Sequence, residues 1–149
     1  MKLVLVVEDE YGLAEFLGLL LESSGYRVAL AHDGKAALEQ MRGEKPALIL
    51  SDFMMPHMNG AELGEIVRNN IAWRDIPFML LSGTNESVVR SSFRRYDAFL
   101  SKPYDADALL TWVDKLINEG RPPKKTPPDS DSSVQEFLRD IGVPPKSKG

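Results

Sequence analysis

The sequence of 149 residues contains no cysteine, which excludes disulfide bonds and metal sites with thiolate ligands. This absence is typical of proteins in a reducing compartment. The chain also lacks a long hydrophobic run: the apolar run near its start, Leu3–Val7, is too short for a signal sequence or a membrane span. We therefore expect a soluble, cytoplasmic protein with no membrane partner.

Positive charge is scarce over most of the chain. There are 18 Lys and Arg residues against 22 Asp and Glu residues, and the net charge is −4. Residues 1–119 are net acidic, whereas residues 120–149 are mildly basic and contain six of the ten prolines. Because an acidic surface repels phosphates, we expect no nucleic-acid partner. The change in composition predicts a domain over residues 1–119 and a Pro-rich basic tail over residues 120–149.

The tail contains one helix signal. Residues 120–132 favour an extended linker, and Ser133 with Glu136 three residues later predicts a capping box. The expected helix covers residues 133–142, and its apolar stripe is formed by Val134, Phe137, Leu138 and Ile141. A helix this short needs a surface to dock on, and an unstructured segment is the alternative. No DNA-reading module fits in the tail.

Four short apolar runs show no alternation of polar and apolar residues, which is typical of strands covered on both faces in a parallel sheet. These runs are Leu3–Val7, Ala47–Leu50, Phe78–Leu81 and Ala98–Leu100. A fifth run, Arg27–Ala31, alternates weakly and predicts an edge strand. Helical patterns fill the gaps, the last over Asp105–Ile117. Because parallel strands need crossover helices, five strand–helix repeats predict an α/β fold, a three-layer sandwich around a parallel five-stranded sheet.

Polar residues follow four of the predicted strands at the points where the strands end. They are Glu8 and Asp9 after the first strand, Asp52 at the end of the third, Ser82 and Gly83 after the fourth, and Lys102 and Pro103 after the fifth. In an open parallel sheet, ligands bind beyond the carboxyl ends of the strands. The topology therefore brings three carboxylates, one hydroxyl and one ammonium group to the same edge.

The charges of these groups predict the chemistry of the edge. Two carboxylates about 4 Å apart repel each other by roughly 4 kcal/mol at an effective dielectric constant near 20. Lys102 can offset one such charge but not three, so the oxygen-rich pocket suits Mg²⁺, with Mn²⁺ as an alternative ion. With the charge balanced, Asp52 could act as a nucleophile toward a phosphoryl group. Ser82 and Lys102 could then hold phosphoryl oxygens.

Each of these residues also has an ordinary structural interpretation. An aspartate after a strand is commonly a turn residue or a helix cap. Glu8 and Asp9 could be acids favoured by the dipole in the first turn of a helix. The placement of all of them on one edge favours a functional site.

Four segments make residues 3–118 similar to the receiver domain of two-component response regulators. The segments are LVLVVEDE (3–10), LILSDFMMPHMNG (48–60), FMLLSGT (78–84) and AFLSKPYDADAL (98–109). The resemblance implies a flavodoxin-like (βα)5 fold with strand order 2-1-3-4-5. With a short tail behind it, the receiver would be of the single-domain type. Its output would then pass through protein contacts, through onward relay of the phosphoryl group or through a partner docked on the tail. A fragment whose effector domain was removed is the alternative.

The resemblance also implies roles for the acidic residues. Asp52 would accept a phosphoryl group from a phosphohistidine on a sensor histidine kinase or a histidine phosphotransfer protein. Mg²⁺ would be bound by Asp9, Asp52 and the backbone carbonyl of Met54, with Glu8 acting mostly through water. Such a protein changes its own phosphorylation state and is not a turnover enzyme. The resemblance leaves a homodimer open.

The remaining implied roles concern the phosphoryl group and the output surface. Ser82, Gly83 and Lys102 would bind the phosphoryl group. Phosphorylation would draw Ser82 inward and let Phe99, at the aromatic switch position, turn toward the core. This would reshape the surface formed by the fourth helix, fifth strand and fifth helix. The peptide bond before Pro103 is typically cis in this family.

Some positions vary from the commonest family pattern. Glu8 stands in place of Asp, Ser82 in place of Thr and Phe99 in place of Tyr, so that no switch hydroxyl is present. Tyr104 stands where Phe is more usual. None of these changes removes a needed group.

Two other functions are compatible with an acidic edge. One is a Mg²⁺-dependent phosphatase with an aspartyl-phosphate intermediate, but such enzymes need a second acid where Met54 stands. The other is a docking scaffold that is never phosphorylated, and the intact acidic set argues against it. In the family, Met54 and Thr84 occupy positions that tune dephosphorylation. Their side chains predict poor positioning of water and a long-lived phosphoryl group.

Basic and histidine residues elsewhere give weaker signals. We interpret Arg90, Arg94 and Arg95 as a basic patch on the fourth helix that faces solvent, with a partner site as the alternative because this helix borders the family's usual output surface. His32 and His57 have no partners at metal-ligand spacing, so we interpret them as ordinary loop residues.

Overall fold

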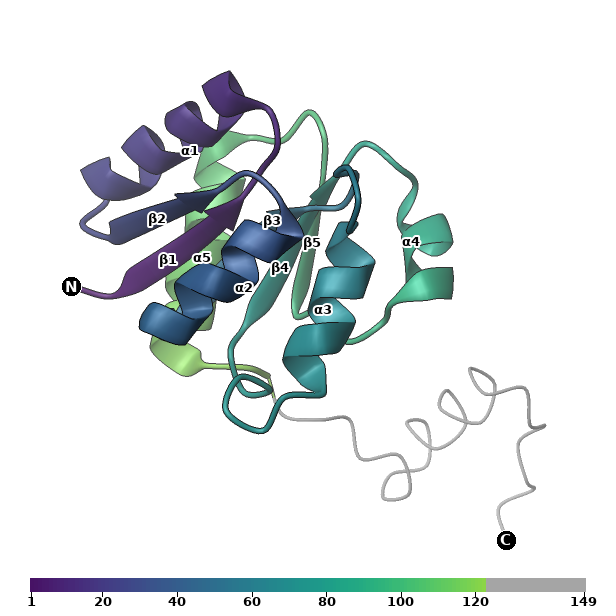
Figure 1. Ribbon diagram of the computed structural model, residues 1–149. Helices are drawn as coiled ribbons and strands as arrows, with labels where there is room; N and C mark the ends of the chain where they lie inside the picture. The colour runs from purple at the N-terminus through teal and green to yellow at the C-terminus, as the bar shows by residue number, and fades with distance from the viewer. Residues whose placement is uncertain (123–149) are drawn as a thin grey trace, which may run out of the picture.

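Strands and helices alternate along the chain in the computed structural model, which describes residues 1–122 (Figure 1). The strands are β1 (Leu3–Val7), β2 (Arg27–Ala31), β3 (Leu48–Asp52), β4 (Phe78–Ser82) and β5 (Ala98–Ser101). The helices are α1 (Tyr11–Ser23), α2 (Gly34–Gly43), α3 (Gly60–Arg68), α4 (Glu86–Ser92) and α5 (Ala106–Glu119). Most of the basic tail, including the helix predicted over residues 133–142, lies outside the described residues.

The five strands form one parallel sheet with the order β2-β1-β3-β4-β5. This order confirms the predicted flavodoxin-like fold, and β2 is an edge strand as its weak alternation indicated. Every residue of β3 and β4 is buried, which explains why these segments are continuously apolar apart from their last residues. The polar exceptions lie at the carboxyl ends of the strands, where the candidate site is expected.

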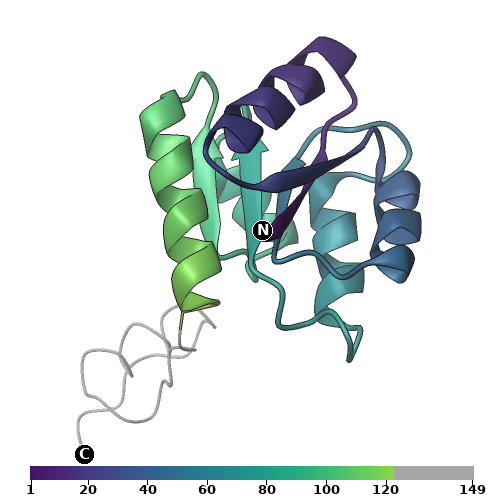
Figure 2. The ribbon, with the colours of Figure 1, turned by 90° about the vertical axis from the view of Figure 1, so that its left-hand side faces the viewer.

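Side chains that alternate along each strand fill two separate cores. Leu5 and Val7 of β1 belong to the core under α2, α3 and α4, whereas Val4 and Val6 belong to the core under α1 and α5. Figure 2 shows α1 and α5 on one side of the sheet and α2 and α3 on the other. Because helices cover both faces, the carboxyl ends of the central strands are where a ligand would be expected to bind.

The loops after β1, β3 and β4 run into helices whose first turns are capped by a side chain. The Glu10 side chain accepts a hydrogen bond from the Leu13 N–H and so caps the start of α1. At α3, Asn59 and Glu62 form a reciprocal capping box. Each cap satisfies free N–H groups in the first turn and so fixes the end of the preceding loop.

Gly60 permits a close approach between the start of α3 and the end of β3. Its N–H donates to the Phe53 carbonyl at 2.8 Å. A Cβ atom on Gly60 would lie 2.6 Å from the Asp52 carbonyl oxygen, so a larger residue would push this loop away.

None of the helices within residues 1–122 combines the length and the apolar character needed to cross a membrane.

Candidate functional site

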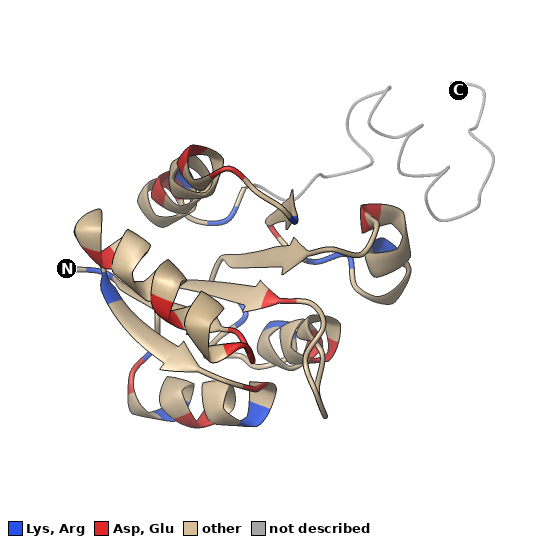
Figure 3. Cartoon of the chain, turned by 90° about the horizontal axis from the view of Figure 1, so that it is seen from above, with Lys and Arg blue, Asp and Glu red and all other residues tan. Residues whose placement is uncertain are grey.

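Three acidic side chains meet at the carboxyl end of the sheet because neighbouring strands are in register. Val7 of β1 and Ser51 of β3 are register partners, so the residues that follow them, Glu8 and Asp52, reach the same edge. One carboxylate oxygen from each of Glu8, Asp9 and Asp52 lies within 4.8 Å of the others. In the view coloured by charge, acidic residues mark the strand end and the adjoining loop at this edge (Figure 3). The sequence prediction that they come together is confirmed.

Two of these three carboxylates are removed from water. Only 2% of Glu8 and 6% of Asp52 is exposed, whereas Asp9 is half-buried. A buried carboxylate is costly unless a positive charge or a set of hydrogen bonds compensates for it. A nearby cation would therefore stabilise the charged form of both groups.

Lys102 supplies part of that charge from the neighbouring strand. Its backbone N–H donates to the Ser82 carbonyl at 2.8 Å, which continues the pairing of β4 with β5. Its Nζ lies 3.1 Å from Oδ1 of Asp52 and 3.6 Å from Oε1 of Glu8. A single ammonium group leaves a cluster of three carboxylates short of positive charge.

This shortage perturbs the titration of the acids. Burial, together with the charge of Asp52, raises the pKa of Glu8 to about 7, although the backbone N–H of Glu10 and the ammonium of Lys102 act in the opposite direction. Burial also raises the pKa of Asp52 against the opposing effect of Lys102. Both groups would be stabilised in their charged form by a further cation.

The donor set fits a hard divalent cation such as Mg²⁺, which binds oxygen ligands. Oε1 of Glu8 is buried and accepts no hydrogen bond from the residues that the structure describes, because its contact with Lys102 is longer than a hydrogen bond. This oxygen is therefore available to a metal ion or to its bound water. Met54, whose backbone carbonyl is the fourth predicted ligand, lies in the β3–α3 loop and is 62% exposed.

The hydroxyl group at the end of β4 is bound within its own loop. Ser82 is fully buried, and its Oγ accepts the Thr84 N–H at 2.8 Å and donates to the Thr84 carbonyl at 3.3 Å. Gly83 is exposed between these two residues. Ser82 is therefore at the predicted edge, and its hydroxyl is held in one orientation by the loop.

The other residues selected from the sequence occupy β5 and the loop after it. Phe99 is half-buried, and its ring centroid lies 5.8 Å from that of Tyr96 with an interplanar angle of 49°. The Lys102–Pro103 peptide bond is cis, as the family resemblance implied.

Two features beside the site were not recognised from the sequence. The hydroxyl of Tyr104 is buried and has no hydrogen-bond partner within residues 1–122, and burial raises its pKa, with a further contribution from Glu8. The ring of His32 stacks on Tyr11 with centroids 3.7 Å apart, and its Nδ1 lies 3.2 Å from the Glu8 carbonyl. The sequence does show an aromatic residue, Tyr104, directly after Lys-Pro and a histidine, His32, directly after a strand. Their contacts could not be predicted, because these depend on tertiary packing.

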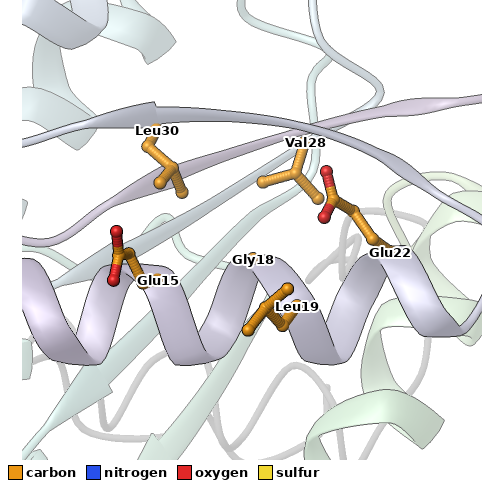
Figure 4. Close-up of a pocket in the computed structure, with 6 residues that line it drawn as sticks. All are labelled: Glu15, Gly18, Leu19, Glu22, Val28 and Leu30. Atoms are coloured by element: carbon orange, nitrogen blue, oxygen red, sulfur yellow. The ribbon is translucent and has the colours of Figure 1, made fainter.

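Away from the acidic edge, a hollow of about 340 Å³ lies between α1 and the edge strand β2. Its walls are formed by Leu19 of α1 with Val28 and Leu30 of β2, and the carboxylates of Glu15 and Glu22 flank it (Figure 4). It holds no basic or hydroxyl side chain. The acidic edge is therefore the better candidate for chemistry.

Comparison with known proteins gives a consistent set of similarities. The family profile of the response regulator receiver domain matches residues 4–114. Response regulator ArlR of Staphylococcus saprophyticus is 32% identical over 127 residues, which cover 84% of this chain and 56% of that protein. Response regulator Rre1 of Synechocystis is 32% identical over 141 residues, which cover 93% of this chain and 61% of that protein. This chain thus spans less than two thirds of either relative.

Solved structures show the same similarity. The signal receiver domain of a signal transduction histidine kinase from Syntrophus aciditrophicus is 32% identical with a TM-score of 0.74, over 85% of this chain and 98% of that one. The response regulator TrrA from Thermotoga maritima, solved in complex with Mg²⁺ and BeF, is 29% identical with a TM-score of 0.71. That match covers 78% of this chain and 99% of the other.

Proposed function

This chain belongs to the response regulator receiver domain family, and from that premise we propose that it is a phosphoacceptor switch in which Asp52 carries the phosphoryl group. The observation that supports this assignment best is the position of Asp52 at the centre of the site. Its carboxylate is buried beside Glu8 and Asp9 and is ion-paired with Lys102 at 3.1 Å. Glu8 shares the cluster and the lysine, but its Oε1 lies farther from Nζ of Lys102, at 3.6 Å, so Asp52 is the acid most closely paired with the ammonium group.

The proposed reaction transfers a phosphoryl group from a phosphohistidine on a sensor histidine kinase or a histidine phosphotransfer protein. A carboxylate oxygen of Asp52 attacks phosphorus as the bond from phosphorus to the imidazole nitrogen breaks. The nitrogen keeps the electron pair, and the product is an acyl phosphate on Asp52 and a free histidine. No water is consumed, and the protein turns over no other substrate. Later hydrolysis of the acyl phosphate restores the carboxylate.

A divalent cation fits this proposal, with Glu8, Asp9, Asp52 and the backbone carbonyl of Met54 as the residues that would hold it. When bound, Mg²⁺ would neutralise the negative charge of the incoming phosphoryl oxygens. The residues of the chain do the rest. Lys102 supplies a second positive charge beside Asp52, while Ser82 and the backbone at Gly83 would bind the remaining phosphoryl oxygens.

The output of the switch is proposed to pass through Ser82 and Phe99. Phosphorylation would draw the Ser82 hydroxyl away from its contacts with Thr84. The vacated space would let the half-buried Phe99 ring turn inward from its contact with Tyr96. The surface of α4, β5 and α5 would change as a result, and partner proteins would recognise that change.

Phosphotransfer profiling tests the proposal directly. The purified chain and its Asp52→Asn variant are each mixed with the autophosphorylated histidine kinases of the source organism. We expect transfer of radiolabelled phosphate to the wild-type chain from one kinase at short times, and none to Asp52→Asn. Transfer that is equal for both chains would overturn the assignment of Asp52.

A further inference from the structure

Most arginines of the described chain gather far from the acidic site. Six of the eight arginines in residues 1–122 lie toward the opposite edge of the sheet, near the amino ends of β4 and β5. We call them the arginine surface: Arg68, Arg74, Arg90, Arg94, Arg95 and Arg121. Two of the residues predicted on the fourth helix are placed differently, because α4 ends at Ser92 and Arg94 and Arg95 follow it in the α4–β5 loop.

A buried arginine holds this surface in place. Arg68 is only 5% exposed. Its Nε donates to the Arg95 carbonyl at 2.9 Å, and its Nη1 donates to the Arg74 carbonyl at 3.2 Å. Its Nη2 donates to Oδ2 of Asp97 at 2.8 Å. One guanidinium thus fixes the backbone of both loops that carry exposed arginines.

The same aspartate fixes the segment after α5. Oδ1 of Asp97 accepts a hydrogen bond from Nε of Arg121 at 2.8 Å, and Nη1 of Arg121 also donates to the Arg74 carbonyl at 3.3 Å. Three segments that are distant in the sequence are therefore tied to one ionic centre. The backbone at Arg74 and Arg95 and the side chain of Arg121 are thus held in place, so less conformational entropy is lost there on binding.

Two adjoining hollows run across this surface. The larger one, about 620 Å³, is lined by Arg74, Arg94, Arg95 and Arg121 above the buried Arg68. The smaller one, about 410 Å³, lies over α4 between Glu86 and Arg90. They share Arg94, so the surface is elongated.

Within residues 1–122, the exposed guanidinium groups are not all neutralised by acidic partners. Arg95 pairs with Glu65 at 2.5 Å. The ion pairs at this edge are formed by Arg68, Arg95 and Arg121. The side chains of Arg74, Arg90 and Arg94 form no ion pair with the residues that the structure describes. A guanidinium presents planar pairs of donors that match a carboxylate.

We propose that the arginine surface binds an acidic segment of a partner protein. An extended polypeptide fits the two hollows, because its carboxylates can lie beside the arginines while avoiding Asp75 and Glu86, which line the same hollows. A compact polyanion would meet those two acids at close range. A nucleic acid would run past the surface onto a protein body that is net acidic. This proposal does not depend on the phosphorylation of Asp52.

Fluorescence anisotropy with a short, labelled, glutamate-rich peptide tests this inference at low ionic strength. The test variant combines Arg90→Gln and Arg94→Gln, two exposed positions where the fold should tolerate the change. The matched control combines Lys35→Gln and Arg42→Gln, which remove the same charge from exposed positions of α2. Thermal unfolding verifies that both variants are folded.

We expect the test variant to weaken peptide binding by about tenfold, because charge-assisted contacts are lost, and the control to bind as the wild type does. Equal weakening in both variants would mean that only net charge matters, which would overturn the proposal. Pyrophosphate and a single-stranded DNA oligomer are used as competitors. Displacement of the peptide by either one at a lower concentration than unlabelled peptide would also overturn it, in favour of a small-anion or nucleic-acid site.

Discussion

The ammonium nitrogen of Lys102 lies 3.1 Å from Oδ1 of Asp52, so the proposed phosphoacceptor is already engaged in an ion pair. The same nitrogen reaches Glu8 at 3.6 Å. Lys102 therefore occupies the region in which a divalent cation would also find its charge partners. The two positive charges share the same carboxylates and repel each other.

Replacing Lys102 should therefore strengthen metal binding while it weakens phosphorylation. In Lys102→Gln, the carboxylates of Glu8 and Asp52 lose their internal counterion, and we expect the affinity for Mg²⁺ to rise severalfold. Isothermal titration calorimetry measures this affinity, with Lys35→Gln on α2 as a control for net charge. Unchanged or weaker Mg²⁺ binding in Lys102→Gln would contradict competition between the lysine and the metal.

The raised pKa of Glu8 predicts a pH-dependent stability in the absence of metal. Because the folded state holds the Glu8 proton up to a pH of about 7, above the ordinary value for glutamate, the stability that this proton provides is fully present below about pH 4. It is lost as the pH rises toward 7. The wild type should thus be less stable at pH 8 than at pH 5 by up to a few kcal/mol from this group.

Glu8→Gln tests this dependence, because glutamine is neutral at every pH. Urea unfolding in a chelator should show that the variant is more stable than the wild type at pH 8 and closer to it at pH 5. Glu39→Gln, at an exposed position of α2, serves as the control. The same stability difference at both pH values would show that Glu8 keeps an ordinary pKa.

Gly60→Ala should destabilise the protein through the loop after Asp52. The added Cβ would lie 2.6 Å from the Asp52 carbonyl oxygen, and overpacking of this kind costs about 1–3 kcal/mol. The matched control is Gly43→Ala at the end of α2, where a Cβ meets nothing within 4 Å. Chemical denaturation compares the two, and equal stabilities would show that the loop relaxes without cost.

Asp97→Asn should destabilise the protein more strongly. Asp97 pairs with Arg68 and Arg121, and its Oδ2 also accepts the Phe78 N–H at 2.9 Å. Removing the charge leaves the buried Arg68 without its partner, at a cost of about 3 kcal/mol or more. Asp75→Asn, at an exposed position, should have little effect on the same urea unfolding curve. A loss below about 1 kcal/mol for Asp97→Asn would mean that Arg68 is held by backbone carbonyls alone.

Sequence patterns predict the sheet and the acidic edge well because both follow from short-range rules. Continuous apolar runs predict buried parallel strands, and the topology then requires Glu8, Asp52 and Lys102 to share an edge. The ionic centre around Arg68 could not be predicted, because Asp97 is 29 residues away and either residue alone suits a solvated surface. The burial of the Tyr104 hydroxyl is likewise set by packing between distant segments.

The most direct test of the account is the location of the acyl phosphate after treatment with acetyl phosphate and Mg²⁺. Reduction with borohydride, followed by peptide mass mapping, identifies the modified aspartate. We predict one phosphoryl group per chain, located on Asp52, that requires Mg²⁺ and is absent from Asp52→Asn and greatly reduced in Asp9→Asn. A phosphoryl group on another residue, or no labelling while Mg²⁺ is bound, would contradict the assignment of Asp52 as the phosphoacceptor.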